Sequence, residues 1–169
     1  MNIAMIIAKN GFRDEEYSQP KEVFLKAGFK VDTFSSSLGI AKGMLGLTAK
    51  VDKIIEELKV EDYDAIIFVG GVGSSEYWEN PVAHKIAKDA VAKNKILAAI
   101  CIAPITLAKA GVLKGKKATV YPSEGTQLKQ LGAEYTSKDV EVDGNIVTAA
   151  GPHAAKQFAE KIKELLVKK

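Results

Sequence analysis

The residues most suited to chemistry in this chain lie around Cys101, its single cysteine. Cys101 directly follows the apolar run 96–100 and precedes the helix-forming stretch 105–110. A side chain at such a strand-to-helix turn projects into the crevice where open α/β sheets bind ligands, and the first amides of a helix favour a thiolate over a thiol. Lone cysteines are also common as small, inert core residues. Both interpretations of Cys101, nucleophile and buried hydrophobe, stay open at this point.

Acidic residues and glycines follow two other expected strands. The acidic run 14–16 comes after the first apolar run, and Gly70 and Gly71 follow the run 64–69. The carboxyl ends of parallel strands meet at one edge of a sheet, so these residues and Cys101 should line one crevice. A carboxyl group there can act as general base or, when protonated, donate a hydrogen bond to a thiolate, and bare glycine amides can hold an oxyanion. A solvated loop and a plain tight turn are the alternatives.

Other kinds of site have weaker support. The segment 71–76 lacks the third glycine of a dinucleotide-binding loop, and the strand that would carry a phosphoacceptor aspartate ends in Val69. His84 is expected on a surface helix, whereas His153 is expected at the start of the last helix, where it could approach the crevice. One cysteine and two distant histidines give no metal-ligand spacing, so we expect neither a metal nor a cofactor.

The elements that must position these residues alternate between apolar strands and amphipathic helices. Unbroken apolar runs of strand length predict parallel strands that are covered on both faces. The expected strands are 2–8, 30–34, 64–69, 96–100, 118–120 and the hairpin pair 140–142 and 145–148; the expected helices are 20–28, 54–58, 80–92, 105–110, 124–131 and 154–167. Pro20 is expected in the first turn of its helix, and 35–51 is expected to form a small hairpin. The alternation predicts an α/β fold with a doubly wound, mostly parallel sheet.

The composition is that of a soluble globular protein, and we expect one domain over residues 1–169. It is 47% hydrophobic and 27% charged, and its net charge of +3 comes from lysines that are interleaved with glutamates instead of forming a basic stripe. The apolar run 3–8 has no basic leader and is too short to span a bilayer, and one cysteine permits no internal disulfide. We therefore expect a cytoplasmic protein with no nucleic-acid partner and no membrane partner.

Several of these patterns together resemble the DJ-1/PfpI superfamily. The marks of that superfamily are an acidic residue four positions before a proline, a strand ending in Gly-Gly, and an Ala-x-Ile-Cys-x-x-Pro elbow. Here they are Glu16 with Pro20, Val69-Gly70-Gly71, and the segment Ala98 to Pro104. Further matches are 27–31, 110–113, 121–122, 142–144 and 151–152, so the resemblance covers nearly the whole chain. It implies a flavodoxin-like sheet that is sandwiched by helices.

The resemblance also implies roles for particular residues. It makes Cys101 the nucleophile and Glu16 a protonated carboxyl that lowers the pKa of the thiol. Gly70, Gly71 and the backbone amide of Ile102 fall at the oxyanion positions.

This chain departs from the protease-like members at one important position. Those members carry a histidine immediately after the cysteine, in the sequence Ile-Cys-His-Gly-Pro, where this chain has Ile102. A second position where some relatives have histidine is Tyr121 here. Without an adjacent imidazole the Cys-His pair for acyl transfer is missing. Tyr121 and His153 remain as auxiliary candidates.

Three functions follow from the resemblance. The first is a cofactor-independent, glyoxalase-like or deglycase-like hydration of small reactive carbonyls such as methylglyoxal, in which Cys101 attacks the aldehyde and Glu16 shuttles protons. The second is a redox-sensing or chaperone-like stress protein, in which peroxide oxidises Cys101 to the sulfinic acid. The third is an intracellular cysteine peptidase that takes a histidine or carboxylate from elsewhere. Family members commonly assemble, so a homodimer or larger homo-oligomer is expected.

Overall fold

Seven strands form the central sheet of the computed structural model, which describes residues 1–168. The sheet has the order β11-β12-β8-β7-β1-β3-β6, and every neighbouring pair is parallel except β11 and β12. The strands are β1 (Asn2–Ile6), β3 (Lys30–Ser35), β6 (Lys53–Ile54), β7 (Ala65–Phe68), β8 (Ile96–Ile100), β11 (Val140–Asp143) and β12 (Ile146–Ala149). Both β7 and β8 are buried along their whole length, which explains their unbroken apolar sequences. The predicted α/β class and mostly parallel sheet are confirmed.

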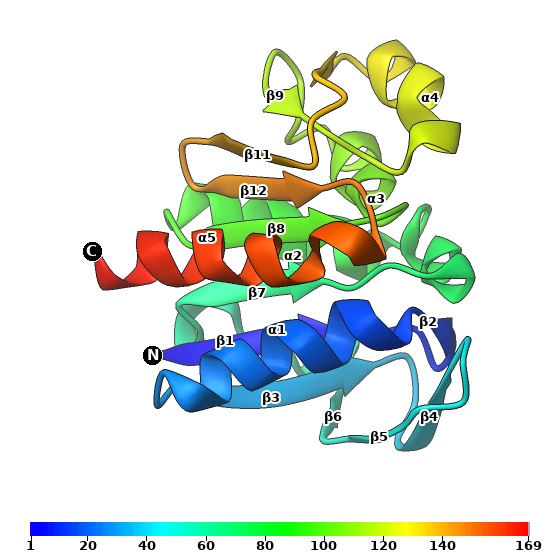
Figure 1. The fold of residues 1–169 in the computed structure, drawn as a ribbon, viewed down its shortest axis with the longest axis vertical. Coiled ribbons are helices and arrows are strands. Elements are labelled where there is room, and N and C mark those ends of the chain that lie inside the picture. Colours follow the sequence, from blue (N-terminus) through cyan, green and yellow to red (C-terminus); the bar gives the residue numbers. More distant parts are fainter. Residues whose placement is uncertain (169) are drawn as a thin grey trace.

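Helices cover both faces of this sheet (Figure 1). The helices α1 (Asp14–Lys26) and α5 (Ala155–Val167) lie side by side on one face, and α2 (Pro81–Ala92) and α3 (Pro104–Lys109) lie on the other. Phe24 of α1 and Phe158 of α5 pack in one hydrophobic cluster against the sheet. A separate cluster on the opposite face contains Phe34 and Phe68. The two cores place the carboxyl ends of β1, β7 and β8 at one edge of the sheet.

Smaller elements surround that frame. A second sheet has the order β2-β4-β5, with β2 (Asn10–Phe12), β4 (Gly39–Gly43) and β5 (Thr48–Val51), and its antiparallel β4–β5 pair confirms the hairpin expected within 35–51. The helix α4 (Gly125–Gln130) lies next to the two short strands β9 (Lys117–Ala118) and β10 (Glu134–Tyr135). Within residues 1–168 there are also five 3-10 helices: η1 (Ile55–Glu57), η2 (Val60–Asp62), η3 (Val72–Tyr77), η4 (Pro122–Glu124) and η5 (Pro152–Ala154). No helix within residues 1–168 is long and apolar enough to cross a membrane.

Three expected elements differ in the structure. The first helix begins at Asp14, so Pro20 lies inside it, and the acidic run belongs to its first turn instead of a loop. A proline inside a helix removes one backbone hydrogen bond and crowds the carbonyl one turn earlier, and α1 nevertheless continues through Pro20, which is itself buried. The expected helix at 54–58 is the end of β6 followed by η1. The expected strand at 118–120 is β9, which pairs with β10 outside the central sheet.

Candidate active site

Cys101 stands at a strained turn between β8 and α3. Its φ angle is +64°, a left-handed conformation that is sparsely populated by non-glycine residues and costs about 1–3 kcal/mol. Two backbone bonds hold the turn: the Cys101 amide donates to the carbonyl of Ala149 at 2.9 Å, and the Tyr121 amide donates to the carbonyl of Cys101 at 2.8 Å. The expected strand-to-helix turn at Cys101 is therefore present, and its backbone is fixed from two sides.

Glu16 lies directly beside this turn. It is fully buried in the first turn of α1, and among the described residues neither carboxyl oxygen has a hydrogen-bond partner of ordinary geometry. Only Gly70 separates the two side chains: a methyl group on Gly70 would collide with Oε1 of Glu16 and would lie 2.5 Å from Cβ of Cys101. The missing side chain at Gly70 allows the carboxyl and the thiol to approach each other.

Gly71 holds α1 against the end of β7. Its φ angle is +103°, and a side chain there would collide with the backbone nitrogen of Arg13. The same close approach lets the Arg13 amide donate to the carbonyl of Gly70 at 2.9 Å. The Gly-Gly pair thus fixes the entry to α1, and with it the position of Glu16.

The environment of Glu16 favours its neutral form. Burial raises the pKa of this carboxyl from 4.5 to about 8. Part of the rise is offset by three groups that lower the pKa: the Cys101 thiol, the charge of Arg13 and the Gly70 amide. Glu16 is therefore protonated at neutral pH. This agrees with the protonated carboxyl that the family resemblance implies.

The environment of Cys101 differs from what the sequence predicts. Burial raises the pKa of the thiol to about 12, and an ionised Glu16 would contribute to that rise, whereas the amides of Gly71 and Ile102 lower it. The expected lowering of the thiol pKa is therefore wrong for the free protein, because desolvation outweighs the backbone amides. Of the three expected oxyanion amides, those of Gly71 and Ile102 act on the sulfur and that of Gly70 acts on Glu16.

An open cleft of about 630 Å³ leads to Cys101. Its lining residues are Arg13, Met44, Gly71, Val72, Ser75, Trp78, Cys101, Ile102, Tyr121, Ser123, Glu124 and Pro152. This volume lies within the roughly 300–1,000 Å³ of typical small-molecule sites. The structure therefore brings Cys101, Gly71, Ile102 and Tyr121 to one cavity, with Glu16 buried behind it.

Neither histidine lines this cleft. Nε2 of His153 lies 3.0 Å from Oδ1 of Asp139, and both side chains are exposed. Nε2 of His84 lies 2.6 Å from the carbonyl of Trp78. The residues described here supply no imidazole to Cys101, and none of their His, Cys, Asp or Glu side chains form a metal-binding group.

Sequence reasoning missed three cleft residues. Arg13 binds Glu15 through Nε and Nη2, each at 3.0 Å, and lines the cleft. The Trp78 indole donates from Nε1 to the carbonyl of Ile102 at 3.1 Å. Met44, in the turn between β4 and β5, lines one side of the cleft. Arg13 and Trp78 are the single arginine and single tryptophan of the chain, a signal that could have found them.

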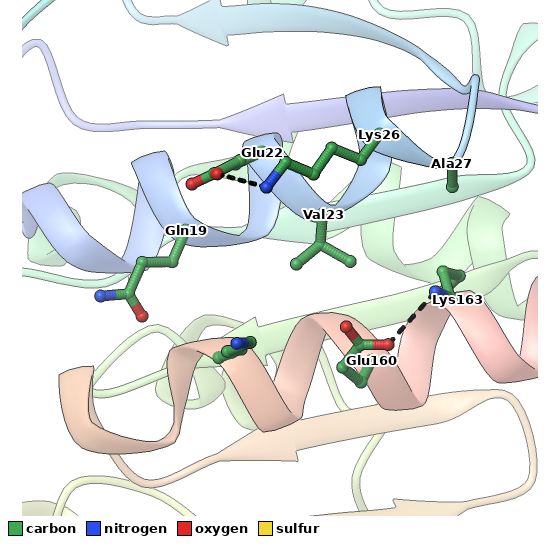
Figure 2. Close-up of a pocket in the computed structure, with 8 residues that line it drawn as sticks. Gln19, Glu22, Val23, Lys26, Ala27, Glu160 and Lys163 are labelled. Carbon is green, nitrogen blue, oxygen red and sulfur yellow. Dashed lines mark ion pairs between the residues drawn. The ribbon is translucent and has the colours of Figure 1, made fainter.

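A second, more polar groove lies away from Cys101, between α1 and α5 (Figure 2). Its volume is about 350 Å³, and ion pairs line it, including Lys26 with Glu22 at 2.8 Å and Lys163 with Glu160 at 3.4 Å. The groove contains no nucleophile. The cleft at Cys101 is therefore the candidate active site.

The fold and the site together describe an α/β protein with a strained cysteine at the end of a central parallel strand, beside a buried carboxyl. The sequence profile of the DJ-1/PfpI family matches residues 1–165, and the chain belongs to this family. Protein MJ0967 of Methanocaldococcus jannaschii is 44% identical over 98% of this chain and 82% of its own length. The deglycase PfpI of Pyrococcus furiosus is 32% identical over 88% of this chain and 89% of its own length. The crystal structure of a ThiJ/PfpI domain protein from Brachyspira murdochii superposes with a TM-score of 0.97 at 32% identity, covering 99% of this chain and 97% of that one.

Proposed function

We propose that this protein hydrates small 2-oxo aldehydes such as methylglyoxal to 2-hydroxy acids, with Cys101 as nucleophile and Glu16 as proton relay. The observation that carries the proposal is one buried, protonated carboxyl next to one strained thiol, with only Gly70 between them. The name of the relative from Pyrococcus furiosus, a deglycase, supports chemistry on reactive carbonyls.

The first step forms a hemithioacetal. The sulfur of Cys101 adds to the aldehyde carbon, and the carbonyl oxygen takes up a proton. A protonated carboxyl can perform both transfers at once, because one oxygen of Glu16 gives its proton to the carbonyl oxygen while the other accepts the thiol proton. This relay explains how a thiol with a raised pKa reacts without first ionising in bulk solution. The amides of Gly71 and Ile102 stabilise charge that develops around the sulfur.

The second step moves a hydrogen within the substrate. Glu16 accepts the proton from the former aldehyde carbon while it protonates the neighbouring ketone oxygen, which gives an enediol. The reverse transfer at the other carbon gives a thioester of the 2-hydroxy acid. Water then attacks the thioester, the bond from sulfur to carbon breaks, and the thiol recovers its proton. The aldehyde carbon is oxidised and the ketone carbon is reduced, so no external oxidant is needed.

Variants of the two groups test the proposal. Cys101→Ser should abolish the conversion of methylglyoxal to lactate, and Glu16→Gln should lower kcat by about 10²–10⁴ because an amide cannot relay the proton. His153→Ala is the matched control, since His153 lies outside the cleft, and it should change kcat/KM by less than about twofold. Lactate formation that survives in Cys101→Ser would end the proposal.

A second candidate function uses the same geometry. Two peroxide molecules can each give one oxygen to the sulfur of Cys101 and leave as water, forming a sulfinic acid. The protonated Glu16 and the amides of Gly71 and Ile102 favour this function because they can bind the sulfinate oxygens. Intact mass after peroxide treatment should then show a stable gain of two oxygens that is absent in Cys101→Ser.

A further inference from the structure

Several of the apolar side chains that line the cleft at Cys101 are exposed. Met44, Val72 and Tyr121 line it with exposed fractions of 40%, 66% and 44%. Trp78, Ile102 and Pro152 complete the apolar lining. Apolar side chains that gather around a cavity next to a nucleophile mark surface that a ligand covers. Met44, Val72 and Trp78 are called the apolar wall below.

Trp78 presents its ring to the cleft in a fixed orientation. Its indole N–H already donates to the carbonyl of Ile102 at 3.1 Å, and its own carbonyl lies 2.6 Å from Nε2 of His84. With the indole donor satisfied, the part of the ring that faces the cleft offers apolar contact only. A ring that is held before binding loses little conformational entropy when a ligand packs on it.

The polar groups of the cleft do not offset this apolar character. Arg13 is the cation at the cleft, and Glu15 occupies its Nε and Nη2. Glu124 brings a negative charge to the same lining, and Ile102 occupies the position beside the nucleophile. An anionic substrate tail would meet a neutralised arginine and a carboxylate, whereas an apolar tail would cover the wall.

We propose that the preferred substrates are 2-oxo aldehydes with an aryl or other bulky apolar substituent, which packs on the apolar wall while the aldehyde carbon meets Cys101. This inference rests on the proposed hydration of 2-oxo aldehydes and specifies its substrate class. A methyl substituent leaves the wall in contact with water, and even one additional methylene in an apolar pocket changes kcat/KM by about 10-fold to 200-fold.

Turnover of phenylglyoxal and methylglyoxal tests the preference through the ratio of their kcat/KM values. Trp78→Ala should lower the ratio by at least about tenfold, because the ring that the phenyl group contacts is gone. Trp78→Phe keeps an aromatic face without the indole donor and should retain most of the ratio. Leu25→Ala, which removes an exposed side chain of α1, is the control and should leave the ratio unchanged. An equal loss for both substrates in Trp78→Ala would overturn the inference, since Trp78 would then only position the elbow.

Alkylation of Cys101 tests the same wall without requiring turnover. In 2-bromoacetophenone and bromoacetone, the CH2 carbon next to the carbonyl forms a bond to the sulfur, its bond to bromine breaks, and bromide and the thiol proton are released. The measured quantity is the rate of alkylation by bromoacetophenone divided by the rate with bromoacetone. This ratio should be at least about tenfold higher for Cys101 than for glutathione, and Trp78→Ala should remove the difference. A wild-type ratio equal to that of glutathione would overturn the apolar-substituent inference. Absence of turnover for both aldehydes, with the alkylation preference intact, would instead overturn the proposed hydration and leave the wall as a subsite for apolar electrophiles.

Discussion

Glu16 and Cys101 act as one titrating unit, because each lies in the other's electrostatic field. Burial raises the pKa of both groups, and the carboxyl, at about 8, is the first to lose a proton. The anion that forms carries its charge on the Glu16 carboxylate, because the thiol keeps its proton up to about pH 12, and this carboxylate can accept the thiol proton as the sulfur reacts. The ionised carboxyl can therefore act as a general base for the thiol.

This coupling predicts the pH dependence of thiol reactivity. Alkylation of Cys101 by iodoacetamide should rise through a step near pH 8 as the pair loses its first proton. In Glu16→Gln the step should vanish, and alkylation at pH 8 should slow by at least about tenfold, because an amide cannot accept the thiol proton as the sulfur reacts. A profile that stays identical in the variant would show that Glu16 does not control the thiol.

The buried carboxyl should also make stability depend on pH. Between pH 4.5 and 8 the folded protein keeps the Glu16 proton and the unfolded chain releases it, so the free energy of unfolding falls as pH rises, by at most about 1.4 kcal/mol per pH unit. Glu16→Gln should remove this contribution and be more stable than the wild type at pH 8. Urea unfolding of both proteins at pH 5 and pH 8 measures this pH dependence. If the free energy of unfolding changed by the same amount in both proteins between the two pH values, the expectation would be contradicted.

At the scale of elements, the three acidic residues that open α1 have three different tasks. Glu16 faces Cys101, Glu15 binds Arg13, and Asp14 binds the turn between β4 and β5. The Asp14 carboxylate accepts hydrogen bonds from the backbone amides of Leu45 and Leu47, at 3.0 and 2.8 Å. Because Met44 precedes these residues, Asp14 fixes one side of the active-site cleft.

Asp14→Ala should loosen that hairpin. The two amides would lose a charged acceptor, at a cost of about 1–3 kcal/mol. Hydrogen exchange should accelerate at Leu45 and Leu47 while the amides of β8 keep their protection. KM for phenylglyoxal should rise, since Met44 would no longer be held in the apolar wall. Unchanged exchange at both amides would contradict the positioning role.

At the scale of the whole molecule, the site depends on both hydrophobic layers. Glu16 is carried by α1, which packs with α5 on one face, whereas Cys101 leads into α3 on the other. The parallel pairing of β1, β7 and β8 brings the residues that follow these strands to one edge. Loosening either layer should therefore expose the thiol.

The single cysteine makes this coupling measurable. Phe158→Ala, in the layer of α1 and α5, should lower the free energy of unfolding by about 3–5 kcal/mol. At pH 6, where the native thiol is protonated, the reaction of Cys101 with a disulfide reagent should follow the same urea transition as circular dichroism. The two midpoints should shift together in the variant, and separate transitions would show that the elbow opens on its own.

The sequence by itself determined the fold class and the placement of an acidic run, a glycine pair and a cysteine after neighbouring strands. Apolar runs of strand length are continuous because both faces of β7 and β8 are covered, and glycines follow β7 because the backbone of α1 approaches closely there. Both features are local consequences of burial, so they can be predicted from the order of residues in the sequence. The positions of the acidic run 14–16, Gly70 and Cys101 could be predicted for the same reason, whereas Glu16 was singled out by the family resemblance.

Only the tertiary structure decided the electrostatics and the cleft. The pKa of Cys101 depends on how deeply the elbow is buried, and depth is set by packing between distant segments, not by neighbours in the chain. Arg13, Met44 and Trp78 come from separate elements and meet only after folding. Whether Asp14 or Glu16 faces the thiol also depended on the helix beginning at Asp14, because residues two positions apart on a helix point to nearly opposite sides.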